Sequence, residues 1–168
     1  MTLRFKIEPN WDISEFYNLD YFLTTHKEYD LIEKYESFGH SKSHMTLYNC
    51  QEPSIMPTFL YDYLKPRFHF LNNIAFAVNL FKPGTYLPIH SDTLKTYTGI
   101  YDVSVEKIIR YIVMLEDSSS GQIIQVEDDC FGKWKAGDCF GWRGPQSHAF
   151  YNFSMKDRYA IQITGSIS

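Results

Sequence analysis

The chain has 168 residues, a formal net charge of −4 and an apolar fraction of 44%, which suits one domain with a single core. Its 16 Lys and Arg are spread along the sequence without the basic stripe of a nucleic-acid-binding protein, so no nucleic-acid partner is expected. No stretch approaches the ~18 apolar residues of a membrane span. The 3 cysteines lack CxxC spacing and indicate neither a disulfide framework nor a zinc ribbon. We expect a single cytoplasmic domain that covers residues 1–168. The sequence leaves its oligomeric state open.

The N-terminal part combines one strand with short helices. Residues 2–8 alternate apolar and polar side chains, which predicts a strand with one buried face. Between residues 12 and 38 apolar residues recur every three or four positions, which predicts two short helices or turns. Residues 39–52 are polar and are expected to form a loop. A further helix is expected between Pro57, which a first helical turn tolerates, and Pro66, which would end it.

From residue 73 onward the pattern is that of strands separated by turn signals. Residues 93–106 are polar and are expected to form an excursion over the surface. The predicted strands cover residues 74–82, 86–92, 108–115, 122–126, 139–142, 146–153 and 158–167. The 13 Tyr and 13 Phe also favour strands. The sequence therefore predicts a mainly β protein whose residues 73–168 form a double-stranded β-helix, or jelly roll, with residues 1–72 as a strand and a helical cover on one face.

The segment from Pro88 to Asp92 carries the clearest chemical signal. His90 and Asp92 are two residues apart on an extended segment, so their side chains are expected to point the same way. His148 follows Asp92 by 56 residues on another predicted strand. Two imidazoles and one carboxylate form the facial set that favours non-haem Fe(II) and leaves coordination positions open. A His-x-Asp triplet alone, or a single histidine on a strand, is more often packed or hydrogen-bonded than bound to a metal. Arg158, ten residues after His148, is the additional coincidence that favours a site.

This set of residues resembles the 2-oxoglutarate- and Fe(II)-dependent oxygenase superfamily over about residues 79–164. Within that region, the segments Trp134-Lys-Ala-Gly-Asp and Ser147-His are similar to the aspartyl/asparaginyl β-hydroxylase-like branch. The resemblance implies a double-stranded β-helix that uses Fe(II), 2-oxoglutarate and O2. It also implies hydroxylation of an amino-acid side chain in a peptide, or of a small polar molecule, with succinate and CO2 as coproducts.

By that resemblance His90, Asp92 and His148 hold the iron, and Arg158 binds the distal carboxylate of 2-oxoglutarate. No catalytic residue beyond the metal ligands is expected. Some members of the hydroxylase branch lack the metal carboxylate that Asp92 supplies here, so the superfamily is the firmer resemblance.

Two further residues are candidates for the cosubstrate site. Several branches of the superfamily place a hydroxyl group two residues after the arginine, but this chain has Ala160 there. Tyr86 is the candidate that replaces it, because it has the same strand parity as His90. Arg110 begins a buried strand, where a charge needs a partner. It either pairs with a structural carboxylate or faces the site and helps to bind 2-oxoglutarate or an acidic substrate.

The alternative from another class is a cupin-like module that binds a metal without redox chemistry. Arg158 separates the two hypotheses, because a simple metal-binding module has no use for a buried guanidinium across the pocket. The prime substrate stays open between a peptide, an amino acid and another small polar molecule.

Overall fold

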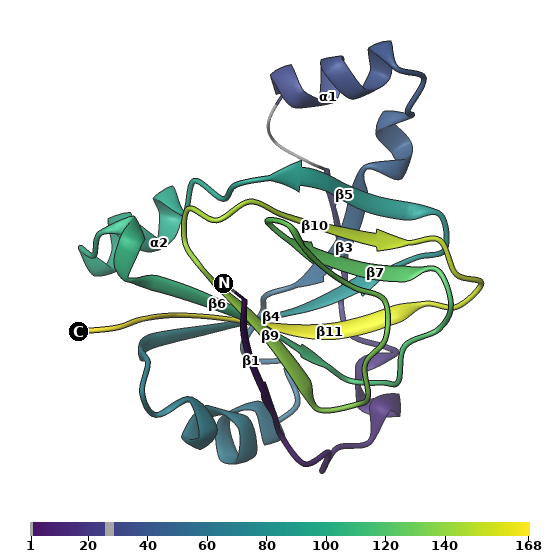
Figure 1. Ribbon diagram of the computed structural model, residues 1–168. Helices are drawn as coiled ribbons and strands as arrows, with labels where there is room; N and C mark the ends of the chain where they lie inside the picture. The colour runs from purple at the N-terminus through teal and green to yellow at the C-terminus, as the bar shows by residue number, and fades with distance from the viewer. Residues whose placement is uncertain (1, 26–28) are drawn as a thin grey trace.

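The structure, a computed structural model, describes residues 2–25 and 29–168 and consists mainly of two antiparallel sheets that face each other (Figure 1). The larger sheet has seven strands, in the spatial order β1 (Leu3–Lys6), β9 (Asp138–Arg143), β6 (Ile108–Met114), β11 (Arg158–Ser166), β4 (Asn72–Phe81), β3 (Thr46–Cys50) and β2 (Phe22–Thr25). The smaller sheet has four strands, in the order β5 (Thr85–His90), β10 (His148–Asn152), β7 (Gln122–Val126) and β8 (Asp129–Phe131).

A core of apolar side chains fills the space between the two sheets. Ile112 and Met114 from β6 and Trp142 from β9 meet Ile124 from β7 and Phe150 from β10. Burial of side chains on the facing sides of two sheets is the main stabilising term in such a sandwich. This arrangement confirms the expected mainly β, double-stranded β-helix fold.

One end of the sandwich is open, and it is the end at which β5 and β11 finish while β6 and β10 begin; we call it the open end. The inward-facing side chains of β11 change along the strand from this end. Each of them lies opposite partners on β4 and β6, in the rows Ala75–Thr164–Arg110, Ala77–Gln162–Ile112 and Asn79–Ala160–Met114, followed by Phe81–Arg158. The interior is therefore polar at the open end and apolar deeper in the sandwich, with the single charge of Arg158 in its deepest row.

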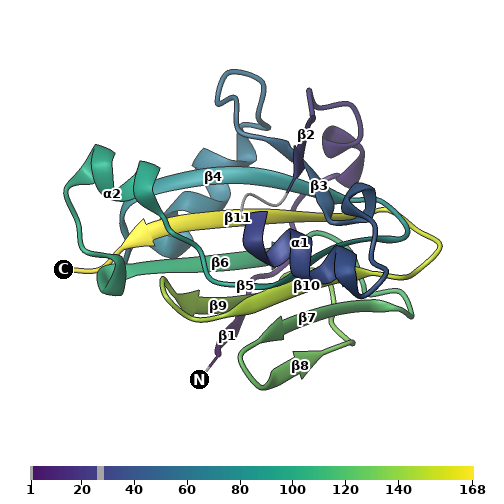
Figure 2. The same ribbon diagram turned by 90° about the horizontal axis from the view of Figure 1, so that it is seen from above.

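Short helices connect and cover the strands. They are η1 (Ile13–Phe16), α1 (Tyr29–Ser37), η2 (Lys42–His44), η3 (Leu60–Leu64), η4 (Lys65–Phe68), α2 (Lys95–Tyr101) and η5 (Val105–Lys107). The helix α2 lies at the open end of the sandwich (Figures 1 and 2). Among the described residues, no helix combines the length and apolar character that a membrane crossing requires.

The N-terminal helices cover both outer faces of the sandwich instead of the expected single face. Phe16 of η1 and Leu60 of η3 pack in one cluster with Ile161 on the outer side of the larger sheet. The helix α1 instead lies above the smaller sheet (Figures 1 and 2), where its Ile32 packs in one cluster with Tyr86 of β5. The outer side of the smaller sheet carries apolar side chains as well, so it too needs a cover.

Four local predictions differ from the structure, and the first is that residues 12–38, expected as two short helices or turns, contain the strand β2. Residues 39–52, expected as a loop, contain β3, which pairs with both β2 and β4 and so extends the larger sheet. The excursion at residues 93–106 contains α2, and the predicted helix does not end at Pro66, because η4 continues to Phe68. Pairing with a long neighbouring strand is a tertiary effect that outweighs the weak local preference of a polar segment.

Candidate metal centre

The local geometry of β5 decides which of its side chains enter the space between the sheets. Residues of β10 pair with β5 as His148 with His90 and then Phe150 with Leu87, so β5 carries one extra residue between these pairs. Such a β-bulge shifts the alternation of side chains by one position. As a result Leu87 and His90 both line the same cavity although they are three residues apart. Pro88 lies within the bulge, where a missing N–H donor is tolerated.

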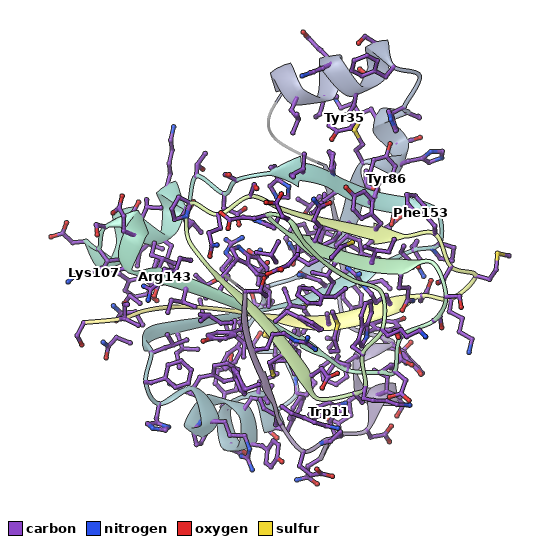
Figure 3. All side chains as sticks on the ribbon, viewed as in Figure 1. Trp11, Tyr35, Tyr86, Lys107, Arg143 and Phe153 are labelled. Carbon is purple, nitrogen blue, oxygen red and sulfur yellow. The ribbon has the colours of Figure 1, made fainter. Side chains whose placement is uncertain are left out.

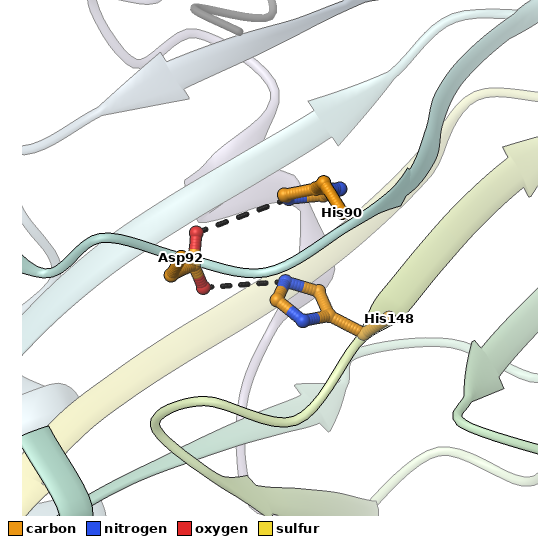
Figure 4. A group of neighbouring side chains, drawn as sticks. All are labelled: His90, Asp92 and His148. Carbon is orange, nitrogen blue, oxygen red and sulfur yellow. Dashed lines mark ion pairs between the residues drawn. The ribbon is translucent and has the colours of Figure 1, made fainter. Parts of the chain in front are cut away.

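His90, Asp92 and His148 converge at the open end (Figure 4). Their candidate ligand atoms all lie within 4.8 Å of one another. The Nε2 atom of His148 is 3.2 Å from Oδ2 of Asp92, and the Nε2 atom of His90 is 3.8 Å from Oδ1. His148 is 1% exposed, whereas His90 and Asp92 are partly exposed, so the group lies at the boundary between the interior and the open end. The structure thus brings together the three residues that the sequence singled out.

Both imidazoles are oriented by backbone carbonyl groups. Nδ1 of His90 donates to the carbonyl of Pro88 at 2.7 Å, and Nδ1 of His148 donates to the carbonyl of Gln146 at 3.1 Å. A carbonyl oxygen only accepts, so Nδ1 carries the proton and Nε2 of a neutral ring presents its lone pair. Two ring lone pairs and a carboxylate that face one another repel unless a cation lies between them, either a metal ion or, in its place, a proton that Nε2 of His148 shares with Asp92. This donor set therefore fits a metal ion.

Arg110 reaches the same carboxylate from β6. Its Nη1 atom donates to Oδ2 of Asp92 at 2.5 Å. Burial alone raises the pKa of Asp92, but the hydrogen bond with His148 and the charge of Arg110 outweigh it and hold that pKa well below its usual range. The two readings of Arg110 left open by the sequence thus converge, because its carboxylate partner is the candidate ligand Asp92.

A cavity of about 280 Å³ adjoins the three residues. The larger sheet contributes Thr24, Asn49 and Asn79 to its wall, while Phe81 and Phe150 line its apolar part. The sequence reasoning did not assign these polar residues to the site. Asn79 had left a signal, because it is the one polar interruption in the apolar run of residues 74–82. Asn49 leaves no such signal, because the polar residues 39–52 predict a loop.

Arg158 lies deeper between the sheets and does not line that cavity. Its guanidinium carbon is 4.3 Å from the ring centroid of Phe81 and 5.5 Å from that of Phe150, the two rings that do line the cavity. Nη1 makes a long contact of 3.4 Å with the carbonyl of Ile123, and Nε and Nη2 have no partner within the described chain. Burial lowers the pKa of Arg158 to about 9. The side chain is 3% exposed, so a charge with unused donors is held among aromatic rings.

Tyr86 does not reach the site, which corrects the expectation based on strand parity. The bulge in β5 places it on the opposite side of the sheet from His90. There its hydroxyl group lies 2.7 Å from Nδ1 of His40, and its ring packs in one cluster with Ile32 of α1. Figure 3 shows Tyr86 on the side of β5 that faces Tyr35 and α1. Burial raises the pKa of Tyr86, which fits a packing role under the helix.

Comparisons with known proteins support the fold. No protein-family model matches the chain, and no curated protein matches it. A prolyl-4-hydroxylase from Pseudomonas putida is similar in structure, with a TM-score of 0.53 and 11% identity over 93% of this chain and 97% of that one. A protein assigned as a sugar phosphate isomerase from Acidithiobacillus ferrooxidans has a TM-score of 0.51 and 8% identity over 94% and 75%. A protein assigned as an oxalate decarboxylase from Thermotoga maritima has a TM-score of 0.45 and 12% identity over 73% and 82%.

The fold and the site together define a double-stranded β-helix protein with a His-Asp-His group that could bind a metal ion. The two structural neighbours with a TM-score above 0.5 are a hydroxylase and an isomerase by their descriptions, so the shared fold does not choose between these activities.

Proposed function

We propose that this chain is a 2-oxoglutarate- and Fe(II)-dependent dioxygenase that hydroxylates an amino-acid side chain in a peptide or a small polar molecule. The observation that carries the proposal is the buried guanidinium of Arg158, which lies deeper in the sandwich than the His-Asp-His group. Two of its nitrogen atoms have no hydrogen-bond partner among the described residues. Buried charges are normally paired. A ligand with a carboxylate group would supply the missing partner.

The metal would be held by His90, Asp92 and His148, a donor set of two imidazoles and one carboxylate that suits Fe(II). When bound, the iron supplies the oxidative chemistry in which O2 and 2-oxoglutarate are consumed and a C–H bond becomes an alcohol. The chain prepares the donors in advance, because two backbone carbonyls orient the rings and Arg110 fixes the carboxylate.

The distal carboxylate of 2-oxoglutarate would pair with Arg158. A guanidinium offers a planar fork of donors that matches a carboxylate in two parallel hydrogen bonds. The guanidinium lies beside Phe150, whose ring centroid is 5.8 Å from that of His148. The side chain of Phe150 thus lies between Arg158 and the candidate metal ligand His148. Because Arg158 is screened from the cavity, the proposal requires the ring of Phe81 or Phe150 to turn aside when the cosubstrate binds.

Aromatic side chains shield the candidate ligands from water. The ring of Trp142 is tilted by 35° against that of His148 at a centroid distance of 4.5 Å. Such packing leaves the imidazole one orientation, and it keeps the interior side of the site dry. A dry site strengthens every electrostatic contact within it.

The alternative is a cupin-like module that binds a metal without redox chemistry, and one titration separates the two. Fe(II) and 2-oxoglutarate are mixed with the protein without oxygen, and the weak visible absorption of the Fe(II)–2-oxoglutarate chelate is followed. We expect a band for the wild type and for Arg143→Ala, which removes an exposed arginine. Truncating one partner of a buried charge pair costs about 2–5 kcal/mol, so Arg158→Ala should weaken 2-oxoglutarate binding roughly thirty- to several-thousand-fold.

Arg158→Lys should fall between these limits, because an ammonium group keeps the charge and loses the fork. A wild type without the chelate band, or an Arg158→Ala variant that titrates like the wild type, would favour the metal-binding module.

A further inference from the structure

Three polar side chains from neighbouring strands form one wall of the cavity, and we call Thr24, Asn49 and Asn79 the amide wall. Asn49 of β3 lies directly opposite Asn79 of β4. Thr24 of β2 is two residues from Phe22, the partner of Asn49, so its side chain points to the same face. All three line the cavity that holds His90 and Asp92. The wall is therefore a continuous surface across three strands.

The amide wall has polar atoms without partners. Oγ1 of Thr24 and the Oδ1 atoms of Asn49 and Asn79 are buried and make no hydrogen bond within the described chain. Asn79 is 5% exposed, so its amide faces the cavity from within the sheet. Buried polar groups in folded proteins are almost always paired, and an unpaired one destabilises the fold. Three such groups side by side indicate that a ligand is their partner.

The charges around the cavity restrict what this ligand group is. The amide wall itself carries no charge, and the ionised pair Asp92 and Arg110 is already joined by its own hydrogen bond. A carboxylate or an ammonium group placed against the wall would lose its hydration without gaining a counter-charge. Each asparagine, in contrast, offers an N–H donor and a carbonyl acceptor. An uncharged group with both functions satisfies them.

A second cavity offers space for the rest of the ligand. A cavity of about 480 Å³ runs along α2 over the small side chains of Ala75 and Ala77. It shares the lining residues Asp92, Arg110 and Gln162 with the first cavity, so the two cavities are neighbours on either side of these side chains. A ligand that extends from the amide wall past Asp92 would reach this second cavity.

We propose that the amide wall binds the prime substrate through a secondary amide, that is, a peptide bond, and that the substrate is a peptide-type molecule and not a free, doubly charged amino acid. The inference rests on the proposed function, in which 2-oxoglutarate extends toward Phe81 and Phe150 and the amide wall of the same cavity is left for the prime substrate. A secondary amide has an N–H donor for the unpaired oxygen atoms of the wall and a carbonyl acceptor for its N–H groups, and it carries no charge. It also allows the ligand chain to continue on both sides of the amide, with one side directed toward the second cavity.

Small isosteric probes test the ligand class without turnover. Dissociation constants for N-ethylacetamide, ethyl acetate, butyrate and propylammonium are measured by ligand-observed NMR on the full chain, without added metal or 2-oxoglutarate. We expect the amide to bind at least about ten-fold more tightly than ethyl acetate and propylammonium, and more tightly than butyrate in the Arg158→Ala variant, which lacks the proposed carboxylate site, because each of these probes leaves a wall group unpaired or buries an unpaired charge. Binding of ethyl acetate or propylammonium to the wild type, or of butyrate to Arg158→Ala, as tight as that of the amide overturns the proposal.

Variants assign the binding to the wall. Asn79→Leu and Asn49→Leu should abolish the preference for N-ethylacetamide, whereas Asn72→Leu, an exposed control on the same strand β4, should keep it. Asn79→Asp keeps the shape of the side chain and should shift the preference toward propylammonium. Retention of the amide preference in both leucine variants, with wild-type-like thermal unfolding, overturns the proposal.

The two proposals fail independently. Preference for the amide without an Fe(II)–2-oxoglutarate band supports the amide wall as the ligand site of a binding module and removes the oxygenase. A chelate band without amide preference keeps the oxygenase and overturns the peptide-bond assignment.

Discussion

One carboxylate oxygen of Asp92 contacts both the guanidinium of Arg110 and the imidazole of His148. Oδ2 of Asp92 accepts from Nη1 of Arg110 and lies 3.2 Å from Nε2 of His148. The other oxygen, Oδ1, faces His90 at 3.8 Å. A guanidinium on β6 therefore sets the plane of a carboxylate that follows β5. The candidate ligands are arranged by the fold, and four predictions follow from this arrangement and its surroundings.

Loss of one imidazole should remove most of the affinity for Fe(II). His148→Ala takes away a buried donor whose ring is held by the carbonyl of Gln146, so two ligands remain. We expect Fe(II) affinity, measured by competition with a chromogenic chelator, to fall at least about ten- to hundred-fold. His69→Ala removes an exposed histidine outside the group and should leave the affinity unchanged. Equal affinities of the wild type and His148→Ala would rule out the assignment.

The ion pair of Asp92 and Arg110 should make stability depend on acid pH. The pKa of Asp92 is lower in the folded protein than its unfolded value of ~3.9. The contribution of ionised Asp92 to the free energy of unfolding is therefore fully present above about pH 4, and it is lost as the pH falls through the pKa of the folded protein. Arg110→Gln should lower the free energy of unfolding at pH 7 by about 2 kcal/mol, less than the ~3–5 kcal/mol of a fully buried pair, because both side chains are 19% exposed.

Urea unfolding at several pH values checks this prediction. The difference between the wild type and Arg110→Gln should shrink as the pH is lowered below about 4. Arg143→Gln, a change at an exposed arginine, should show no such difference at any pH. A stability gap that stays constant down to the lowest pH would mean that Asp92 does not carry the effect.

Replacing Arg158 by an apolar residue should stabilise the protein that lacks ligands. Its charge is buried among Phe81, Trp134 and Phe150, and no acidic side chain pairs with it in residues 2–25 and 29–168. Apolar replacement of buried charged groups is neutral to stabilising by about 1–4 kcal/mol. We expect Arg158→Met to raise the midpoint of urea unfolding and to lose 2-oxoglutarate binding. A strongly destabilised Arg158→Met variant would show that the guanidinium has a structural role instead.

The bulge in β5 should be required for the site and not for the fold. Deletion of Ile89, an exposed residue of the bulge, leaves His90 opposite His148 but makes Pro88 its direct neighbour, so the Pro88 carbonyl can no longer accept from Nδ1 and orient the ring. We expect Fe(II) affinity to fall as in His148→Ala, while the circular dichroism spectrum stays β-rich. Ile89→Ala keeps the extra residue and should bind Fe(II) like the wild type. Unchanged affinity after the deletion would show that the bulge does not position His90.

The sequence was sufficient for the fold class and for the three candidate ligands. The apolar runs after residue 73 are long and separated by strong turn signals, so the strands are marked locally. His90, Asp92 and His148 are recognised by residue type and spacing, and both are read directly from the chain. The excess of Tyr and Phe added to the same conclusion, because aromatic side chains pack well between sheets.

The tertiary structure decided which way side chains face and which partner each one meets. Strand parity predicted that Tyr86 accompanies His90, but the extra residue opposite β10 separates them, and only strand pairing reveals a bulge. Thr24 and Asn49 lie on strands that exist because β4 leaves an edge for them to pair with. Arg110 meets Asp92 although 18 residues separate them in the chain. Residue type is a local property of the chain, whereas register and facing depend on hydrogen bonds between distant strands, and these form only in the folded protein.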